Sequence, residues 1–312
     1  MAALPIYLAG VSLHRLQGKG VRIPWDLPGI AADLGFQGVA LSDRELAGLD
    51  PAAVARLVRQ NRDHGCGLIL DINADLTLAG ADALARELQH VRYWLDQAAA
   101  NQVSRVRLAI GGQRFSYQRI FHPRKPQSRL YAQKGPTPES CPARIKGLLG
   151  RDVILPLSRW MRNLAPGTRP HPARALARVQ LPLSLVVAWA RRRNIRIGIE
   201  NHWGVTTHPE ELAAILDHFD AACLGSCPDF GNFPSFRNPY QGLRLLAARA
   251  VMVHAKSHSF TDRGEETSID FGRCLAILRG ARFKGPLCVE YEGRRAPLAA
   301  VARTRDLICR YL

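Results

Sequence analysis

Four side chains suited to metal binding and proton transfer lie in the second half of the sequence, each near the end of a short apolar stretch. They are Glu200, Asp229, His254 and Glu290, separated by 29, 25 and 36 residues. Each gap is about the length of one unit of strand, loop, helix and loop in a parallel α/β barrel. Carboxylates and imidazoles bind divalent cations, and two carboxylates can also remove and return a proton. The spacing therefore indicates a metal-assisted acid–base site built on successive strands.

The alternation of apolar and polar residues indicates which way these side chains point. In the stretch 195–200, three isoleucines alternate with Arg196, Gly198 and Glu200, and the stretches 224–229, 251–256 and 287–292 also alternate. In a barrel, one set of side chains meets the covering helices and the other faces the interior. Three carboxylates that meet there would repel one another without a cation. We therefore predict one divalent metal ion held by all four residues, with Mn²⁺, Mg²⁺ or Co²⁺ favoured over a closed tetrahedral zinc.

Strand patterns alternate with helix patterns along the whole chain. The expected strands are 5–11, 38–41, 67–72, 103–110, 195–200, 224–229, 251–256 and 287–292. The expected helices are 26–34, 51–64, 81–99, 183–193, 209–219, 240–248, 269–279 and 297–311. Barrels of this length commonly form one domain. The pattern predicts an α/β fold, a (β/α)8 TIM barrel that spans residues 1–312 as a single domain, and no nucleotide-binding fingerprint competes with it.

The net charge of +17 is concentrated in one segment. Residues 113–175 contain 13 basic and two acidic residues, and nine of the twenty prolines. Because the segment follows the fourth expected strand, we interpret it as a basic, proline-rich insertion that could act as a lid over the carboxyl-terminal face of the barrel. A basic lid would suit a phosphorylated or carboxylated substrate. A solvated surface or a subunit interface is the alternative interpretation.

Other features of the sequence concern compartment and partners. No apolar run reaches the length of a membrane span, and residues 1–10 are expected to be the first strand, not a signal peptide. Seven cysteines without paired metal spacing fit reduced thiols in a cytoplasmic protein. We expect a small carbohydrate partner that could be anionic, with neither a membrane nor a nucleic acid as partner. The sequence leaves a homo-oligomer open.

Five short motifs lie at expected strand ends: SLHR at 12–15, ENHWG at 200–204, CPDFGNF at 227–233, VHAKS at 253–257 and VEYEG at 289–293. Together they resemble the xylose-isomerase-like barrels of the sugar phosphate isomerase/epimerase family, which includes ketose epimerases and inosose dehydratases. The resemblance implies the same four metal ligands, and it implies Glu200 and Glu290 as the acid/base pair on opposite sides of the substrate carbon. The chain also departs from the ketose 3-epimerases, which have a histidine and an arginine where this sequence has Asn232 and Phe260.

Further side chains near the strand ends are candidates for contact with a substrate. They are His14, His202, Trp203, Asn232 and Lys256. Lys256 could instead only offset the carboxylates, and Trp203 could be an ordinary packing aromatic.

Two choices between neighbouring charged residues also arise from the sequence. Glu290 is preferred to Glu292 as the ligand of the eighth strand, because Glu292 could pair with Lys256 at the rim. Arg107 points into the barrel from the fourth expected strand, and we expect it to pair with Asp71.

The function that these residues predict is a metal-dependent isomerase or epimerase acting on a keto-sugar or sugar phosphate. Proton abstraction next to a carbonyl would proceed through a metal-stabilised enediolate. Mn²⁺ is the favoured cofactor, with Mg²⁺, Co²⁺ or Zn²⁺ as alternatives. A metal-dependent lyase or dehydratase acting on a keto-sugar, keto-glycoside or inosose is the first alternative. A non-catalytic partner subunit and an endonuclease IV-like nuclease are two others, and the second lacks the extra histidines that such a nuclease implies.

Overall fold

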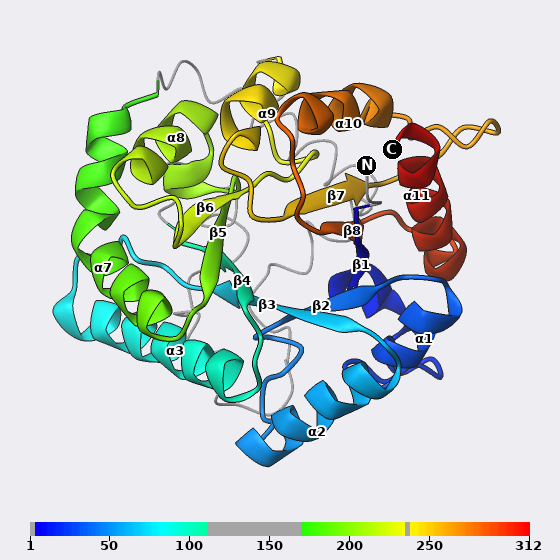
Figure 1. Ribbon diagram of the computed structural model, residues 1–312, viewed down its shortest axis with the longest axis horizontal. Coiled ribbons are helices and arrows are strands. Elements are labelled where there is room, and N and C mark those ends of the chain that lie inside the picture. Colours follow the sequence, from blue (N-terminus) through cyan, green and yellow to red (C-terminus); the bar gives the residue numbers. More distant parts are fainter. Residues whose placement is uncertain (1–3, 112–169, 235–237) are drawn as a thin grey trace, which may run out of the picture.

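Eight parallel strands surround a central axis and eight long helices cover them, in a computed structural model that describes residues 4–111, 170–234 and 238–312 (Figure 1). The strands are β1 (Ile6–Ala9), β2 (Gly38–Ser42), β3 (Gly67–Asn73), β4 (Arg105–Ala109), β5 (Arg196–Glu200), β6 (Leu224–Cys227), β7 (Val253–Ser257) and β8 (Leu287–Tyr291). The helices are α1 (Leu27–Asp33), α2 (Pro51–Asp63), α3 (Ala81–Ala100), α7 (Pro172–Arg192), α8 (Pro209–Asp217), α9 (Pro239–Ala247), α10 (Phe271–Gly280) and α11 (Pro297–Tyr311). Two short 3₁₀ helices, η1 (Gly10–Leu16) and η3 (Gly204–Thr206), follow β1 and β5.

The strand order is that of a TIM barrel. Neighbouring strands pair in the order β6-β5-β4-β3-β2-β1-β8-β7, and isolated bridges such as Asp229 with His254 join β6 to β7. Each strand is followed by a helix on the outside, so all the strands run in the same direction (Figure 1). The predicted (β/α)8 fold is confirmed. The carboxyl ends of all eight strands therefore lie at one rim.

Apolar side chains fill the barrel on both sides of its wall. The large core lies between strands and helices, and it contains the outward residues of the strands, such as Ile197, Leu224, Val253 and Val289. A smaller cluster lies inside the barrel and consists of Ala9, Ala40, Ile69, Cys227, Val251, Met252 and Cys288. These mostly small residues fill the interior below the rim, where the polar side chains gather.

Tyr7 fills the amino-terminal end of the interior, and two glycines make room for it. Tyr7 pairs with Gly38 in register, and Gly38 pairs with Gly67 on the next strand. A Cβ atom on Gly38 would lie 2.5 Å from Tyr7 Cζ, and one on Gly67 would overlap the Tyr7 hydroxyl. The aromatic ring therefore lies across two positions that exclude any larger residue.

Helix α7 begins earlier than the sequence suggested. It starts at Pro172 and continues through Pro182, whereas the predicted helix was 183–193. Its buried stripe of Ala175, Val179, Leu183 and Val186 runs across the proline without a break. Burial of that stripe outweighs the roughly 3 kcal/mol cost of an interior proline.

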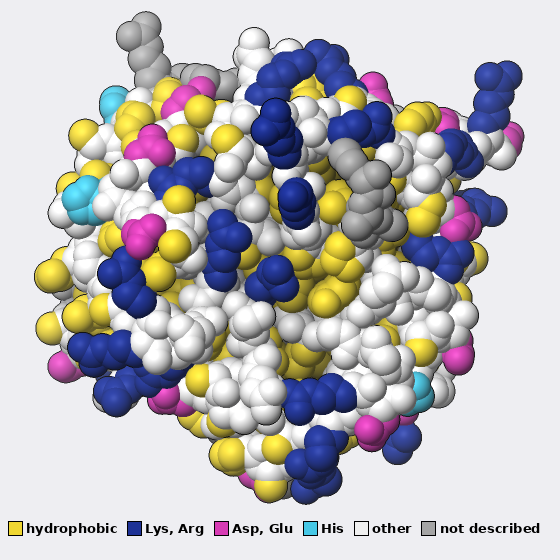
Figure 2. Space-filling model, in the orientation of Figure 1, with side chains coloured by type: hydrophobic (Ala, Val, Ile, Leu, Met, Phe, Trp, Pro, Cys, Tyr) yellow, Lys and Arg dark blue, Asp and Glu magenta, His cyan; other side chains and the backbone are white. Residues whose placement is uncertain are grey.

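The predicted insertion at 113–175 lies almost entirely outside the described residues, and its function as a lid stays a prediction. On the face seen in Figure 2, basic side chains are interspersed with acidic and apolar ones and do not form a single patch. Among the described parts of the chain, no helix has both the length and the apolar character needed to cross a membrane.

Candidate metal and active site

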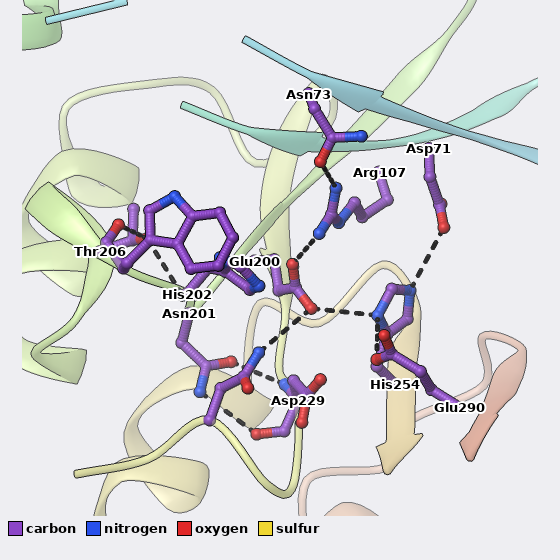
Figure 3. Close-up of polar contacts among 12 residues, drawn as sticks. Asp71, Asn73, Arg107, Glu200, Asn201, His202, Thr206, Asp229, His254 and Glu290 are labelled. Carbon is purple, nitrogen blue, oxygen red and sulfur yellow. Dashed lines mark hydrogen bonds and ion pairs between the residues drawn. The ribbon is translucent and has the colours of Figure 1, made fainter. Parts of the chain in front are cut away.

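The four residues singled out by their spacing meet at the carboxyl-terminal rim (Figure 3). Glu200 ends β5, Asp229 lies two residues beyond β6, and His254 and Glu290 lie within β7 and β8. One ligand atom from each residue lies within 4.8 Å of those from the other three. Glu200, Asp229 and His254 are at most 2% exposed. The structure thus brings together in one small volume three carboxylates and one imidazole.

The donor set fits a divalent cation. Asp229 Oδ2 and Glu290 Oε2 are buried and accept no well-directed hydrogen bond from any described residue. Buried carboxylate oxygens without hydrogen bonds are costly unless a cation is nearby. Three oxygen ligands with one nitrogen ligand are typical of Mn²⁺, Mg²⁺ or Co²⁺ sites that keep positions open for substrate.

Lys256 supplies one positive charge to this cluster. Its Nζ lies 3.0 Å from Asp229 Oδ2, 3.5 Å from Glu290 Oε2 and 3.1 Å from Glu292 Oε1. Glu292 thus pairs with Lys256, as the sequence suggested. Burial opposes ionisation of Glu290, but Lys256 and His254 lower the pKa of its carboxyl well below the usual value. Burial raises the pKa of Asp229 well above the usual value, because Glu290 and Glu200 add repulsion and Lys256 only partly offsets it.

Arg107 supplies the second positive charge, and here the sequence-based expectation was wrong. Its guanidinium forms an ion pair with Glu200 and donates to Asn73 Oδ1 at 2.8 Å, in place of the expected pair with Asp71. In the sheet, Arg107 lies in register between Asp71 and Gly198. Gly198 has no side chain, so the guanidinium can extend to Glu200, two residues further along β5. Burial opposes ionisation of Glu200, but Arg107 lowers the pKa of this carboxyl strongly.

The imidazole of His254 has a defined orientation. Its Nδ1 lies 3.1 Å from Glu200 Oε1 and 3.4 Å from Glu290 Oε2, and its Nε2 lies 3.9 Å from Asp71 Oδ2 (Figure 3). Nδ1 is therefore the nitrogen that faces the ligand cluster. Burial raises the pKa of Asp71 to about 6. A carboxylate behind a ligating histidine is a common way to fix the ring and its tautomer.

The candidate substrate contacts differ in their distance from the cluster. Asn232 lies within it, with Nδ2 3.4 Å from Glu200 Oε1 and Oδ1 3.0 Å from Lys256 Nζ. His202 packs edge-on against Trp203 with ring centroids 3.7 Å apart, and burial lowers the pKa of His202 to about 4. His14 is exposed on η1, and its Nδ1 lies 2.6 Å from Val11 O. Among the described residues, nothing connects His14 to the carboxylates.

Several residues that position the site were not identified from the sequence. Asn201 holds the backbone of Asp229 on both sides, accepting from its N–H at 2.6 Å and donating to its carbonyl at 3.2 Å. Asn73 binds Arg107, and Asp71 faces His254. The inward position of Asp71 and Asn73 on their strand was visible in the alternation, but their partners on other strands were not.

Comparisons with known proteins agree with this geometry. The family model described as xylose isomerase-like TIM barrel matches residues 149–311. Similar solved structures include an L-ribulose 3-epimerase (15% identity, TM-score 0.66, 99% of this chain and 95% of that chain). They also include a 3-keto-D-glucoside 4-epimerase from E. coli (13%, 0.66, 99% and 100%) and a probable 3-DHS dehydratase from Bacillus anthracis (13%, 0.63, 97% and 98%). A search of curated proteins found no matching sequence.

Proposed function

The chain belongs to the xylose isomerase-like TIM-barrel family, and on that premise we propose that it is a divalent-metal-dependent isomerase or epimerase of a keto-sugar or sugar phosphate. The observation that carries the proposal is the convergence of Glu200, Asp229, His254 and Glu290 within 4.8 Å. The structural neighbours named above are epimerases and a dehydratase, which supports an enzyme. At these low identities they support the fold, and the reaction rests on the site.

The four converging residues would hold one metal ion, with Mn²⁺ favoured. When bound, such an ion offsets the negative charge of the carboxylates and polarises a substrate carbonyl next to them. The buried, unbonded oxygens of Asp229 and Glu290 support this assignment.

Glu200 and Glu290 are proposed as the acid/base pair. Lys256 and His254 keep Glu290 ionised, and Arg107 does the same for Glu200, so each carboxylate can accept a proton. One glutamate would take the proton from the carbon next to the carbonyl, and the electron pair of the broken C–H bond would move into an enediolate. A proton returned to the same carbon from the other glutamate gives an epimer, and one returned to the neighbouring carbon gives an isomer.

A lyase is the second candidate, and one observation favours it. Asn232 and Phe260 occupy the positions where the ketose 3-epimerases have a histidine and an arginine, so the substrate contacts of those enzymes are not reproduced. With a leaving group on the carbon beyond the carbanion, the same proton abstraction leads to elimination. The second glutamate or Lys256 would then protonate the departing oxygen. Keto-glycosides and inososes are the substrates to test first.

Proton NMR in D₂O distinguishes the proposed reactions. The purified protein, loaded with Mn²⁺, is incubated with a panel of ketoses, ketose phosphates, keto-glycosides and inososes, and the metal is removed before spectra are recorded. Deuterium at the carbon next to the carbonyl with a new epimer or isomer supports the first proposal, and loss of water or of a glycoside supports the lyase. Glu290→Gln should abolish exchange, and Glu292→Gln is the control because its carboxylate also pairs with Lys256. Metal-loaded protein that exchanges no proton in any of these substrates would contradict both proposals and favour a non-catalytic partner subunit.

A further inference from the structure

A line of hydrogen bonds runs from a helix on the outside of the barrel to Glu200. His90 on α3 lies with Nε2 2.8 Å from Asp43 Oδ2, just beyond β2. Asn73, the last residue of β3, donates from Nδ2 to Asp43 Oδ1 at 2.8 Å and from its backbone N–H to Asp43 Oδ2 at 2.9 Å. Arg107 on β4 donates to Asn73 Oδ1 at 2.8 Å and forms the ion pair with Glu200. Figure 3 shows the last part of this line, from Asn73 through Arg107 to Glu200.

The polarity of the line leaves little freedom at any member. Asp43 is 1% exposed and accepts from both N–H groups of Asn73, so the ring nitrogen of His90 that faces it must be the protonated one. Because the Asn73 amide donates to Asp43, its oxygen must face Arg107. The guanidinium is planar and rigid, so a bond from one terminal nitrogen to Asn73 fixes the direction of the other toward Glu200.

The line connects two halves of the barrel with different functions. All four candidate metal ligands come from β5 to β8. The line passes instead through the ends of β2, β3 and β4. On the proposed function, the first half of the barrel would therefore set where the Glu200 carboxylate lies.

We propose that Asp43 and His90 are positioning residues that act through Asn73 and Arg107 to orient the Glu200 carboxylate for metal binding. The proposal rests on the metal site proposed above. A purely structural tie between α3 and the loops offers the alternative explanation. Glu87 is a matched example of such a tie: it is 1% exposed, lies three residues before His90 on α3, and accepts from the Asp75 backbone N–H at 3.0 Å.

Three substitutions separate the two explanations. Asp43→Asn keeps the size of the side chain, but its amide must turn a donor toward one of the N–H groups that Asp43 now accepts. His90→Leu removes the donor to Asp43, whereas His90→Gln retains an N–H at a similar reach. The control is Glu87→Gln, which alters a buried polar contact of the same helix.

The first experiment measures binding of Mn²⁺ alone by calorimetry and by its EPR spectrum, with the melting temperature in EDTA as a measure of the fold. We expect Asp43→Asn and His90→Leu to weaken Mn²⁺ binding about tenfold, as substitutions behind metal ligands commonly do. His90→Gln should restore binding to within about twofold of the wild type. Glu87→Gln should lower the melting temperature without changing Mn²⁺ affinity or the EPR spectrum. Equal losses of affinity in all four variants, or none in any, would overturn the positioning proposal.

A second measurement does not depend on the metal. In EDTA, the melting-temperature losses of Asp43→Asn and Glu200→Gln should not add in the double variant, although the two side chains are joined only through Asn73 and Arg107. Additive losses would overturn the proposal. If the wild type binds no Mn²⁺ while the losses still fail to add, the proposed function is wrong and the connection to Glu200 stands.

Discussion

Replacing one metal ligand should make the metal-free protein more stable and the metal-loaded protein less stable than the wild type. Asp229→Asn is the change that shows this most clearly. Asp229 is fully buried, burial raises its pKa, and Glu200 and Glu290 repel it. The amide keeps an oxygen that can accept the Gly231 N–H, now bound at 2.7 Å.

The size of the effect follows from these contacts. Without metal, removal of one buried charge should raise the free energy of unfolding by about 1 to 2 kcal/mol, even though Lys256 loses one partner. With free Mn²⁺ at 100 times the dissociation constant, the wild type gains about 2.7 kcal/mol from binding, and the variant gains little. The order of stabilities should therefore reverse between EDTA and Mn²⁺. Urea unfolding in the two buffers measures both values.

Glu292→Gln is the matched control for this reversal. It removes the same charge from the same lysine, at a side chain that is 47% exposed. Because an exposed ion pair contributes at most about 1 kcal/mol, its stability should change little in either buffer, and it should keep the gain from Mn²⁺. If Asp229→Asn is less stable than the wild type in EDTA and gains as much from Mn²⁺, the reasoning about the charge of this site is refuted.

Three further predictions follow from the described contacts. Glu200→Gln and Glu290→Gln should each lower deuterium exchange into substrate by about 10²- to 10⁴-fold with the circular dichroism spectrum unchanged, and wild-type exchange in either variant would contradict the acid/base roles. Gly67→Ala should cost about 1 to 3 kcal/mol in urea unfolding because its Cβ would overlap the Tyr7 hydroxyl, and an unchanged midpoint would show that the ring moves freely. Burial lowers the pKa of His202 from 6.5 to about 4, so its contribution is complete above pH 6.5 and is lost as the pH falls to 4, when the unfolded chain binds the proton first. In EDTA, His202→Gln should therefore lose less stability than the wild type across that window, by about 3 kcal/mol, and parallel losses would count against this explanation.

The sequence predicted the four converging residues because period and direction are local properties. In β5, β7 and β8 the apolar residues alternate strictly, and this alternation alone places Glu200, His254 and Glu290 inside the barrel. Repeated spacing then brings them to the same rim. The barrel and the meeting of the four side chains were therefore accessible without the structure.

Contacts that depend on register or reach were not accessible in this way. The pair of Arg107 with Glu200 requires that Arg107 lie beside Gly198, and this pairing is set by how two strands slide against each other. His14 lies in a motif at a strand end, yet the 3₁₀ turn of η1 leaves it exposed beside Val11. Helix α7 passes through Pro182 because tertiary burial outweighs a local preference.

The most direct test of the central claim is a crystal structure of the protein soaked in Mn²⁺, with anomalous scattering to locate the ion. The proposed function predicts a single strong peak bound by Glu200, Asp229, His254 and Glu290. Four side chains that keep their ion pairs with Arg107 and Lys256, with no anomalous peak between them at millimolar Mn²⁺, would contradict it.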